Sequence, residues 1–407
     1  MTEMLQSTGE TGGELQALTQ RLRELIPVIR EYSGEAEHIR RIPQPVIDRA
    51  SELGIFDALV PRRWGGQELG LAAFYTSARE LAHGDMSAAW VVSLLMSWNT
   101  MACRMPLEAQ EQLYADRNYI TAALAYFPPG KAERADGGYT VSGKWGYGSG
   151  LPNADWAFLS GMFDTDNGPD MLAFLVPKSD LILHDDWKFA GLSSTGSVSF
   201  SAEDVFVPEQ FAISFGALMS PFDHPGATLH ADPTHRFLGG PTVSNPWGAG
   251  IALGGAERMV ELARERLFNS QIMGISRIDQ PLSRVRWAQA HQLVRAAELL
   301  YDKLVAETVA HGEGYWRRED TGQQTMDTLT IVALCKDAAR LIMDGAGSSA
   351  WSTGNELQRY FRDMHVLANH LQHDWDNGAE RASRHLLGLP YAPTDPFNTE
   401  GPEAAHA

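Results

Sequence analysis

Apolar residues first recur at helical spacing near the N-terminus. From Leu15 to Ile29, and again over residues 45–53 and 72–82, they return every three or four positions, which places them on one face of an α-helix. These runs predict an N-terminal helical domain over residues 14–117. Residues 1–13 are rich in Ser, Thr, Gly and Glu, so we expect a disordered tail there.

The pattern changes near Tyr119 to short apolar and aromatic runs separated by Gly, Pro, Asp and Asn. This alternation is typical of strands joined by turns. The runs cover residues 119–125, 139–147, 156–163 and 171–176. They predict a middle β-domain over residues 118–212.

A proline-rich, irregular connection follows the middle domain. A loop of this length in a compact domain is usually functional, so residues 213–246 are predicted to form a lid or pocket loop. Helical spacing resumes near Trp247 and predicts a C-terminal four-helix bundle over residues 247–390, followed by a tail over residues 391–407. The clearest helical runs cover residues 290–304, 325–346 and 356–387. The predicted fold class is therefore α+β.

Charge and cysteine content narrow the function. The 407 residues include 51 Asp and Glu against 33 Lys and Arg, a net charge of −18, which disfavours nucleic-acid partners and acidic membrane surfaces. The two cysteines, Cys103 and Cys335, are far apart, which favours a reducing compartment and a cytoplasmic location. We expect no export signal and no membrane segment, because no apolar stretch approaches the ~20 residues that span a bilayer.

Three stretches of the middle domain point to a cofactor: Gly137–Gly150, Gly191–Ser197 and Asp204–Glu209. Their glycine- and serine-rich loops can hold a flat aromatic cofactor and its phosphate, which makes a flavoprotein the first hypothesis. The glycine-rich run Gly248–Gly254 follows no predicted strand and lacks dinucleotide-binding spacing. It favours close helix packing rather than a nicotinamide site.

The order of the domains, the segment Pro61–Gly66 and the loop Gly191–Ser197 resemble the acyl-CoA dehydrogenase fold. Three further features resemble the oxygenase components of two-component flavin-dependent monooxygenases built on that fold. They are Ser142–Gly150, Tyr126–Lys131, and Arg362-Asp363 followed by His370. The resemblance covers about residues 14–390.

The resemblance implies an oxidoreductase that uses reduced FMN or FAD and O2, through a C4a-hydroperoxide. Such an enzyme oxygenates an aromatic, heteroaromatic or polycyclic small molecule, and a separate NAD(P)H-dependent reductase supplies its reduced flavin. FMN and FAD stay equally open. The fold also implies a homotetramer, with a dimer as the minimum, because its flavin sites usually lie at subunit contacts.

By the same resemblance, the Ser149 hydroxyl lies beside flavin N5, accepts a hydrogen bond from the N5 proton and slows loss of peroxide. The alternative is a simple turn between Gly148 and Gly150, for which serine is common. Trp145 is expected to flank the isoalloxazine ring and Tyr126 to lie on a neighbouring strand. Core packing is the alternative for both aromatic residues.

Thr195 and Ser197 offer hydroxyls and backbone amides at a turn, suited to the flavin phosphate or ribityl chain. The alternative is a simple strand connection. The resemblance also places an arginine at the flavin phosphate of a neighbouring subunit. Arg266 is the candidate, with Arg264 and Arg286 as other possible matches, and a solvated helix face as the alternative.

His370 is the candidate base, since an imidazole with a pKa of about 6.5 can take a proton from a phenol, indole or amine. It follows Arg362 where the family pattern has its histidine. The alternative is a packed or surface histidine. His370 and His373 are expected to share a helix face from which His365 departs, so no metal site is predicted.

Trp90 and Trp98 are candidate walls of a substrate pocket, with core packing as the alternative. Several relatives place a histidine about two helical turns after Trp90, whereas this chain has Ser97-Trp98-Asn99. This departure weakens a phenol-type assignment. The two tryptophans can instead present flat apolar walls to a larger polycyclic substrate, and core packing explains them equally well.

Ser352 bears on whether the chain is a dehydrogenase or an oxygenase. Dehydrogenases of this fold often carry a glutamate base where the segment Trp351–Arg359 has Ser352, and a hydroxyl alone is too weak a base near neutral pH. Ser352 is otherwise expected to cap the helix that begins near Asn355. An acyl-CoA dehydrogenase-like enzyme with a displaced base and a non-catalytic relative stay open as alternatives.

Overall fold

The structure is a computed structural model that describes residues 10–165, 168–220, 223–230, 234, 241–311, 318–390 and 392. Two compact units make up the described part of the chain, one within Ser7–Gly240 and the other within Pro241–Ala407, called here the N-terminal unit and the C-terminal unit. The predicted helical domain and β-domain therefore belong to one unit. Within the described residues, no helix is both long and apolar enough to cross a bilayer.

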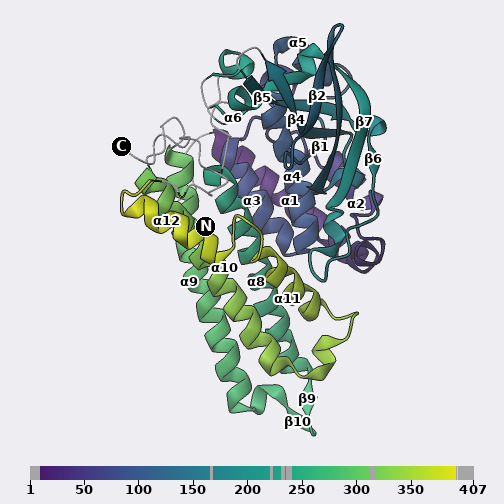
Figure 1. The fold of residues 1–407 in the computed structure, drawn as a ribbon. Coiled ribbons are helices and arrows are strands. Elements are labelled where there is room, and N and C mark those ends of the chain that lie inside the picture. The colour runs from purple at the N-terminus through teal and green to yellow at the C-terminus, as the bar shows by residue number, and fades with distance from the viewer. Residues whose placement is uncertain are drawn as a thin grey trace. The chain divides into compact units, whose positions relative to one another are not determined.

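The helices of the N-terminal unit come first in the chain (Figure 1). They are α1 (Glu10–Ile39), α2 (Gln44–Glu52), α3 (Gly70–Ala82), α4 (Met86–Ala102) and α5 (Leu107–Leu113). Helix α1 begins at Glu10, inside the segment predicted to be a tail, while residues 1–9 lie outside the described part. Leu18, Leu22 and Leu25 are fully buried along one face of α1, as the helical spacing predicts.

Helix α4 is apolar on nearly all sides and packs against α3 and the first strand, Ala122–Leu124. Asp85 caps its N-terminus by accepting a hydrogen bond from the Ala88 N–H at 3.0 Å. A helix that is apolar all round is normally buried, and every residue of α4 except Leu94 and Trp98 is buried. These two residues are one turn apart and so form the single half-buried stripe of α4.

An eight-stranded sheet follows, with the order β6-β7-β3-β2-β4-β5-β8 and β1 added beside β4 in parallel. The strands are β1 (Ala122–Leu124), β2 (Gly130–Ala135), β3 (Gly138–Gly148), β4 (Trp156–Thr165), β5 (Gly168–Pro177), β6 (Ile182–Leu183), β7 (Val198–Pro208) and β8 (Ala212–Ser214). The β3–β7 register shifts between Trp145 and Gly148. Such an irregularity re-aims the side chains beyond it.

The predicted lid over residues 213–246 is partly regular structure. Its first residues complete β8 and form helix α6 (Phe215–Met219), and helix α8 (Pro241–Asn269) begins before Trp247. Residues 221–222, 231–233 and 235–240 lie outside the described part. His230 is buried and its Nε2 donates to the Gln110 Oε1 at 2.8 Å, which ties residues 223–230 to α5.

The C-terminal unit is a helical bundle with a small hairpin (Figure 1). Its elements are α8, β9 (Gln271–Ile272), β10 (Ile275–Ser276), α9 (Pro281–His311), α10 (Arg318–Ala346), α11 (Glu356–Leu367) and α12 (Trp375–Leu386). Helix α10 packs against α8, α9, α11 and α12. The run predicted as one helix over residues 356–387 is broken, because a turn separates α11 from α12 and Asp374 caps α12.

The small residues at the start of α8 allow close packing, as the sequence predicts. A methyl group added at Gly250 would lie 2.4 Å from the Tyr301 hydroxyl, and one added at Gly248 would lie 2.0 Å from the His373 ring. Neither position has room for a side chain. Of the predicted C-terminal tail, the structure describes position 392 alone.

Candidate functional site

Two loops of the N-terminal unit hold residues in the left-handed region of φ. Tyr147 (φ 61°) and Gly150 (φ 76°) lie at the end of β3, and Leu192 (φ 49°) and Gly196 (φ 55°) lie in the loop before β7. This conformation costs a non-glycine residue about 1 kcal/mol, so Tyr147 and Leu192 store strain. Strained backbone of this kind concentrates at functional sites.

The two loops bring three predicted site residues into one hydrogen-bonded group, called here the hydroxyl chain. The Ser149 Oγ lies 2.7 Å from the Ser197 Oγ, which lies 2.7 Å from the Thr195 Oγ1. The Thr195 hydroxyl donates to the Leu192 carbonyl at 2.8 Å. Thr195 and Ser197 are buried, whereas Ser149 is half-buried. The Ser149 hydroxyl is therefore the outer end of the chain.

Further contacts fix the geometry of the hydroxyl chain. The Gly150 N–H donates to the Thr195 carbonyl at 2.9 Å and joins the two loops. A methyl group at Gly150 would lie 3.2 Å from Val91, and one at Gly196 would lie 3.1 Å from Pro152. The loops are thus packed against α4, the helix that carries Trp90 and Trp98.

The two candidate substrate residues differ in exposure. Trp90 is 5% exposed and belongs to the core of the helical layer. Trp98 is half-buried, and its indole N–H has no hydrogen-bond partner among the described residues. The neighbouring Asn99 is fully buried and bonds the backbone of Ile120 in both directions, at 2.9 and 3.0 Å. Asn99 therefore has a structural role. Trp98 is the residue of this pair that presents a partly exposed side chain.

Trp145 packs inside the sheet. It is fully buried, stacks on Phe200 with 5.5 Å between ring centroids, and lies under the backbones of Gly130 and Gly143. Its indole N–H donates to the Ser160 carbonyl at 3.1 Å. This is core packing, and contact between the Trp145 ring and a flavin stays a prediction.

Tyr126 lies next to this core because the Ser160 hydroxyl donates to the Tyr126 carbonyl. Its ring meets Phe215 of α6 edge-on, with 5.0 Å between centroids. Its own hydroxyl is buried and has no partner within the described residues. Burial raises the pKa of Tyr126 far above its usual value, and nearby Arg104 opposes that rise. Tyr126 therefore stays neutral and can donate one hydrogen bond.

In the C-terminal unit, His370 lies in the turn between α11 and α12 rather than in a helix. Its carbonyl accepts the N–H groups of His373 and Asp374 at 2.7 and 2.8 Å, and its Nδ1 accepts the Gln372 N–H at 3.4 Å. Burial lowers the pKa of His370 to about 4. The imidazole is therefore neutral near pH 7, with a lone pair for a proton, and burial makes it a weaker base than a free histidine.

His373 packs beside His370, with 5.6 Å between ring centroids, but the two do not share a helix face. It is 2% exposed and lies against Gly248. Burial, and then the charge of His370, lower the pKa of His373 to about 3. Among the described residues, no three His, Cys, Asp or Glu side chains gather as a metal site would require.

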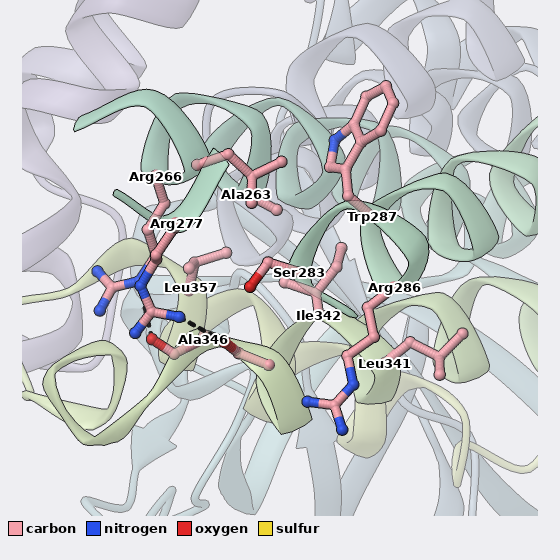
Figure 2. A pocket seen from close by; sticks show the side chains of 12 residues that line it. Ala263, Arg266, Arg277, Ser283, Arg286, Trp287, Leu341, Ile342, Ala346 and Leu357 are labelled. Carbon is pink, nitrogen blue, oxygen red and sulfur yellow. Dashed lines mark hydrogen bonds between the residues drawn. The ribbon is translucent and has the colours of Figure 1, made fainter. Parts of the chain in front are cut away.

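Three arginines of the C-terminal unit meet at the end of α10, around a cavity of about 40 Å³ (Figure 2). Each donates to a main-chain carbonyl of the last turn: Arg266 to Ala346 at 2.9 Å, Arg277 to Gly345 at 2.8 Å and Arg286 to Asp344 at 3.0 Å. Cations are favoured at a helix C-terminus, whose carbonyls lack helical partners. The three residues are called here the arginine cluster.

The arginine cluster has spare capacity for an anion. Its guanidiniums form no ion pair with a carboxylate of the described chain, and the buried Arg277 Nε has no hydrogen-bond partner there. Burial, and then the charge of Arg277, lower the pKa of Arg266. Arg264 is exposed and lies over Phe268, outside the cluster.

Sequence reasoning missed Arg277. It reaches the cluster through the hairpin that precedes it, and no spacing along the chain shows that contact. Ser352 was expected to cap α11 but does not. Asn355 caps this helix instead, by accepting a hydrogen bond from the Leu357 N–H at 3.0 Å. Ser352 itself is exposed.

Comparison with known proteins covers nearly the whole chain. Residues 14–116 match the acyl-CoA dehydrogenase N-terminal domain, and residues 243–375 match the C-terminal domain of that name. The chain is 31% identical over 382 residues to HsaA of Rhodococcus jostii (strain RHA1), a flavin-dependent monooxygenase oxygenase subunit, covering 92% of this chain and 99% of the relative.

Two further relatives match this chain over most of its length. The p-hydroxyphenylacetate 3-hydroxylase oxygenase component of Acinetobacter baumannii is 28% identical, over 93% of this chain and 90% of the relative. The solved structure of XiaF from Streptomyces sp., in complex with FADH2 and glycerol, superposes with a TM-score of 0.85 at 25% identity, covering 94% of this chain and 98% of XiaF.

Proposed function

Because the chain belongs to the family of oxygenase components of two-component flavin-dependent monooxygenases, with the acyl-CoA dehydrogenase fold, we propose that its substrate is an aromatic, heteroaromatic or polycyclic small molecule. It is a monooxygenase that uses O2 and reduced flavin from a separate reductase. The reduced flavin supplies the electrons that activate oxygen. The choice between FMN and FAD stays open.

The hydroxyl chain is the observation that carries this proposal, because it fits a reduced flavin. Ser149 is its half-buried outer end and offers an acceptor to the flavin N5–H, while Thr195 and Ser197 stand behind it. By accepting that hydrogen bond, Ser149 would hold the N5 proton in place and so would disfavour loss of peroxide before oxygen transfer. Trp145 of β3 and Tyr126 are proposed to support the flavin beside Ser149. Tyr126 was expected on a neighbouring strand, but it lies in the connection between β1 and β2.

The substrate is proposed to meet Trp98 and Trp90, with His370 as the base that takes its proton. Support comes from the half-buried Trp98 on α4 and from the neutral state of His370. A neutral imidazole can accept a proton from a phenol, indole or amine as that substrate reacts. The unpartnered Tyr126 hydroxyl offers a donor to a substrate or cofactor oxygen.

The arginine cluster is proposed to bind the flavin phosphate of a neighbouring subunit in a homotetramer. Its unpaired positive charge supports this role, since planar guanidiniums bind phosphate well. A cytoplasmic location is proposed as well. It fits the two free, buried cysteines, Cys103 and Cys335.

The test is anaerobic titration with reduced FMN and, separately, reduced FAD, followed by admission of labelled O2 with phenols, indoles and polycyclic aromatics. We expect tight binding of at least one reduced flavin and one labelled oxygen atom in a product. A protein with affinity for neither reduced flavin would overturn the proposal. Bleaching of bound oxidised flavin by an acyl thioester, without a reductase, would instead identify a dehydrogenase.

A further inference from the structure

The hydrogen atoms of the hydroxyl chain can be assigned from chemistry alone. A carbonyl oxygen carries no hydrogen, so the 2.8 Å contact between Thr195 Oγ1 and the Leu192 carbonyl requires the Thr195 hydrogen to lie between them. Each hydroxyl has a single hydrogen. The Thr195 hydroxyl therefore uses its hydrogen to donate to the Leu192 carbonyl. It can only accept a hydrogen bond from Ser197.

The same reasoning passes outward along the chain. The Ser197 hydroxyl donates a hydrogen bond to Thr195 across 2.7 Å. It must therefore accept a hydrogen bond from Ser149 across the second 2.7 Å contact. Ser149 then has no hydrogen left for a ligand. Its remaining lone pairs make the half-buried outer end of the chain an acceptor only.

The surrounding structure holds this arrangement in place. Thr195 is 2% and Ser197 5% exposed, so water has little access to replace either bond. Reversing the chain would leave the Thr195 and Leu192 oxygens 2.8 Å apart without a hydrogen between them. The strained backbone at Leu192 and the packed Gly196 keep the loop from moving to relieve that contact.

We infer that the hydroxyl chain makes the site selective for the redox state of the flavin, with Ser197 and Thr195 as positioning residues that keep Ser149 an acceptor. The inference rests on the proposed placement of Ser149 beside flavin N5. Reduced flavin has a hydrogen on N5 and would use it to donate a hydrogen bond to Ser149. Oxidised flavin presents a lone pair there, which meets the lone pairs of Ser149.

This selectivity suits an enzyme that receives its reduced flavin from another protein. The reduced form is retained while oxygen and substrate react. The oxidised form loses its hydrogen bond at N5 and gains a repulsive contact. The backbone carbonyl of Leu192 is thus the fixed point that sets the preference, three hydroxyl groups away from the ligand.

The test measures dissociation constants of the full-length protein for reduced and oxidised flavin, without oxygen for the reduced form. We expect the wild type to bind the reduced form more tightly. Ser149→Ala should weaken reduced-flavin binding by about tenfold, the effect of one buried hydrogen bond. Ser197→Ala frees the Ser149 hydrogen to donate to oxidised N5, so it should reduce the preference by about tenfold while reduced flavin still binds.

Matched variants separate chemistry from damage to the fold. Thr195→Val removes the inner acceptor and should act like Ser197→Ala, whereas Thr195→Ser keeps the hydroxyl and should restore the wild-type preference. Ser142→Ala is the control, because Ser142 is a β3 serine bonded to Asp204 at 2.7 Å, outside the hydroxyl chain. It should leave both dissociation constants unchanged.

A flavin analogue tests the idea without mutation. Reduced 5-deazaflavin has a CH2 group in place of N5–H, so the wild type should bind it about tenfold more weakly than natural reduced flavin. Ser149→Ala should bind the two alike. If Ser149→Ala behaves like the wild type, the proposed N5 placement fails. If Ser149→Ala responds as expected but Ser197→Ala and Thr195→Val keep the full preference, the inference fails while the placement stands.

Discussion

The two units of the protein present polar groups in different ways. In the N-terminal unit, the hydroxyl chain consists of neutral groups whose hydrogens are fixed by a backbone carbonyl. In the C-terminal unit, the candidate groups are the titratable His370 and the permanently charged arginine cluster. One unit therefore acts through fixed geometry, and the other through charge that burial, pH and salt can change.

The sharpest contrast between the units is expected from His370→Ala. If this imidazole takes the substrate proton, its loss should lower the rate of substrate oxygenation by about a hundredfold. Reduced-flavin affinity should stay unchanged, because no contact between His370 and the flavin is proposed. Single-turnover kinetics with pre-bound reduced flavin separate the two quantities.

His365→Ala provides the control for that experiment. His365 lies five positions earlier on α11, where its Nδ1 contacts the Phe361 carbonyl at 2.8 Å, and it has no proposed role in the reaction. Its loss should leave the oxygenation rate within about twofold, because no contact with the substrate or the flavin is proposed for this half-buried side chain. A parental rate in His370→Ala would remove the base from the mechanism.

The sequence indicates the candidate residues of the N-terminal unit more clearly than those of the C-terminal unit. Thr195 and Ser197 stand out because glycine and serine cluster in a strand-connecting loop, and Ser149 stands out through the family resemblance. Their mutual contacts depend on β7 lying beside β3, which pairing decides and local sequence does not. The fold class follows from periodicity alone, since helical and strand spacing alternate in long blocks.

The C-terminal site depends on features with weak local signals. The turn that holds His370 contains neither glycine nor proline, so residues 368–374 resemble a continuing helix. Asp374 as the cap of α12 is the one local sign of a break. The depressed pKa of His370 and the meeting of Arg266 with Arg277 arise from burial and tertiary contacts. The spacing of apolar residues along the chain predicts neither the pKa nor the arginine contact.

The pH dependence of the stability should reveal the low pKa values of His370 and His373. The folded pKa values of His370 and His373 are about 4 and about 3, below the value of about 6.5 for a free histidine. Between pH 6.5 and about 4 the unfolded chain therefore binds more protons than the folded one. Stability must fall as the pH falls through this window, by up to about 1.4 kcal/mol per pH unit for each histidine.

Urea unfolding at several pH values measures this effect. His373→Gln keeps a side chain of similar polarity at the position but removes a titrating group, so it should make the curve shallower. The change should be confined to the window below pH 6.5. An unchanged slope in His373→Gln would mean that His373 has the same pKa in the folded and the unfolded protein, contrary to its burial against Gly248.

The smallest expected effect belongs to the arginine cluster, where water and salt screen part of the charge. Arg266→Gln should weaken reduced-flavin binding by about fivefold at low salt, and by less at high salt, if the cluster binds the flavin phosphate. Arg264→Gln is the matched control, two positions away and outside the cluster. Titration at two ionic strengths decides between a phosphate site and a simple cap of α10. A pure cap would lower the unfolding temperature of Arg266→Gln while leaving the salt dependence of flavin binding as in the wild type, because the three carbonyls at the end of α10 would be its whole purpose.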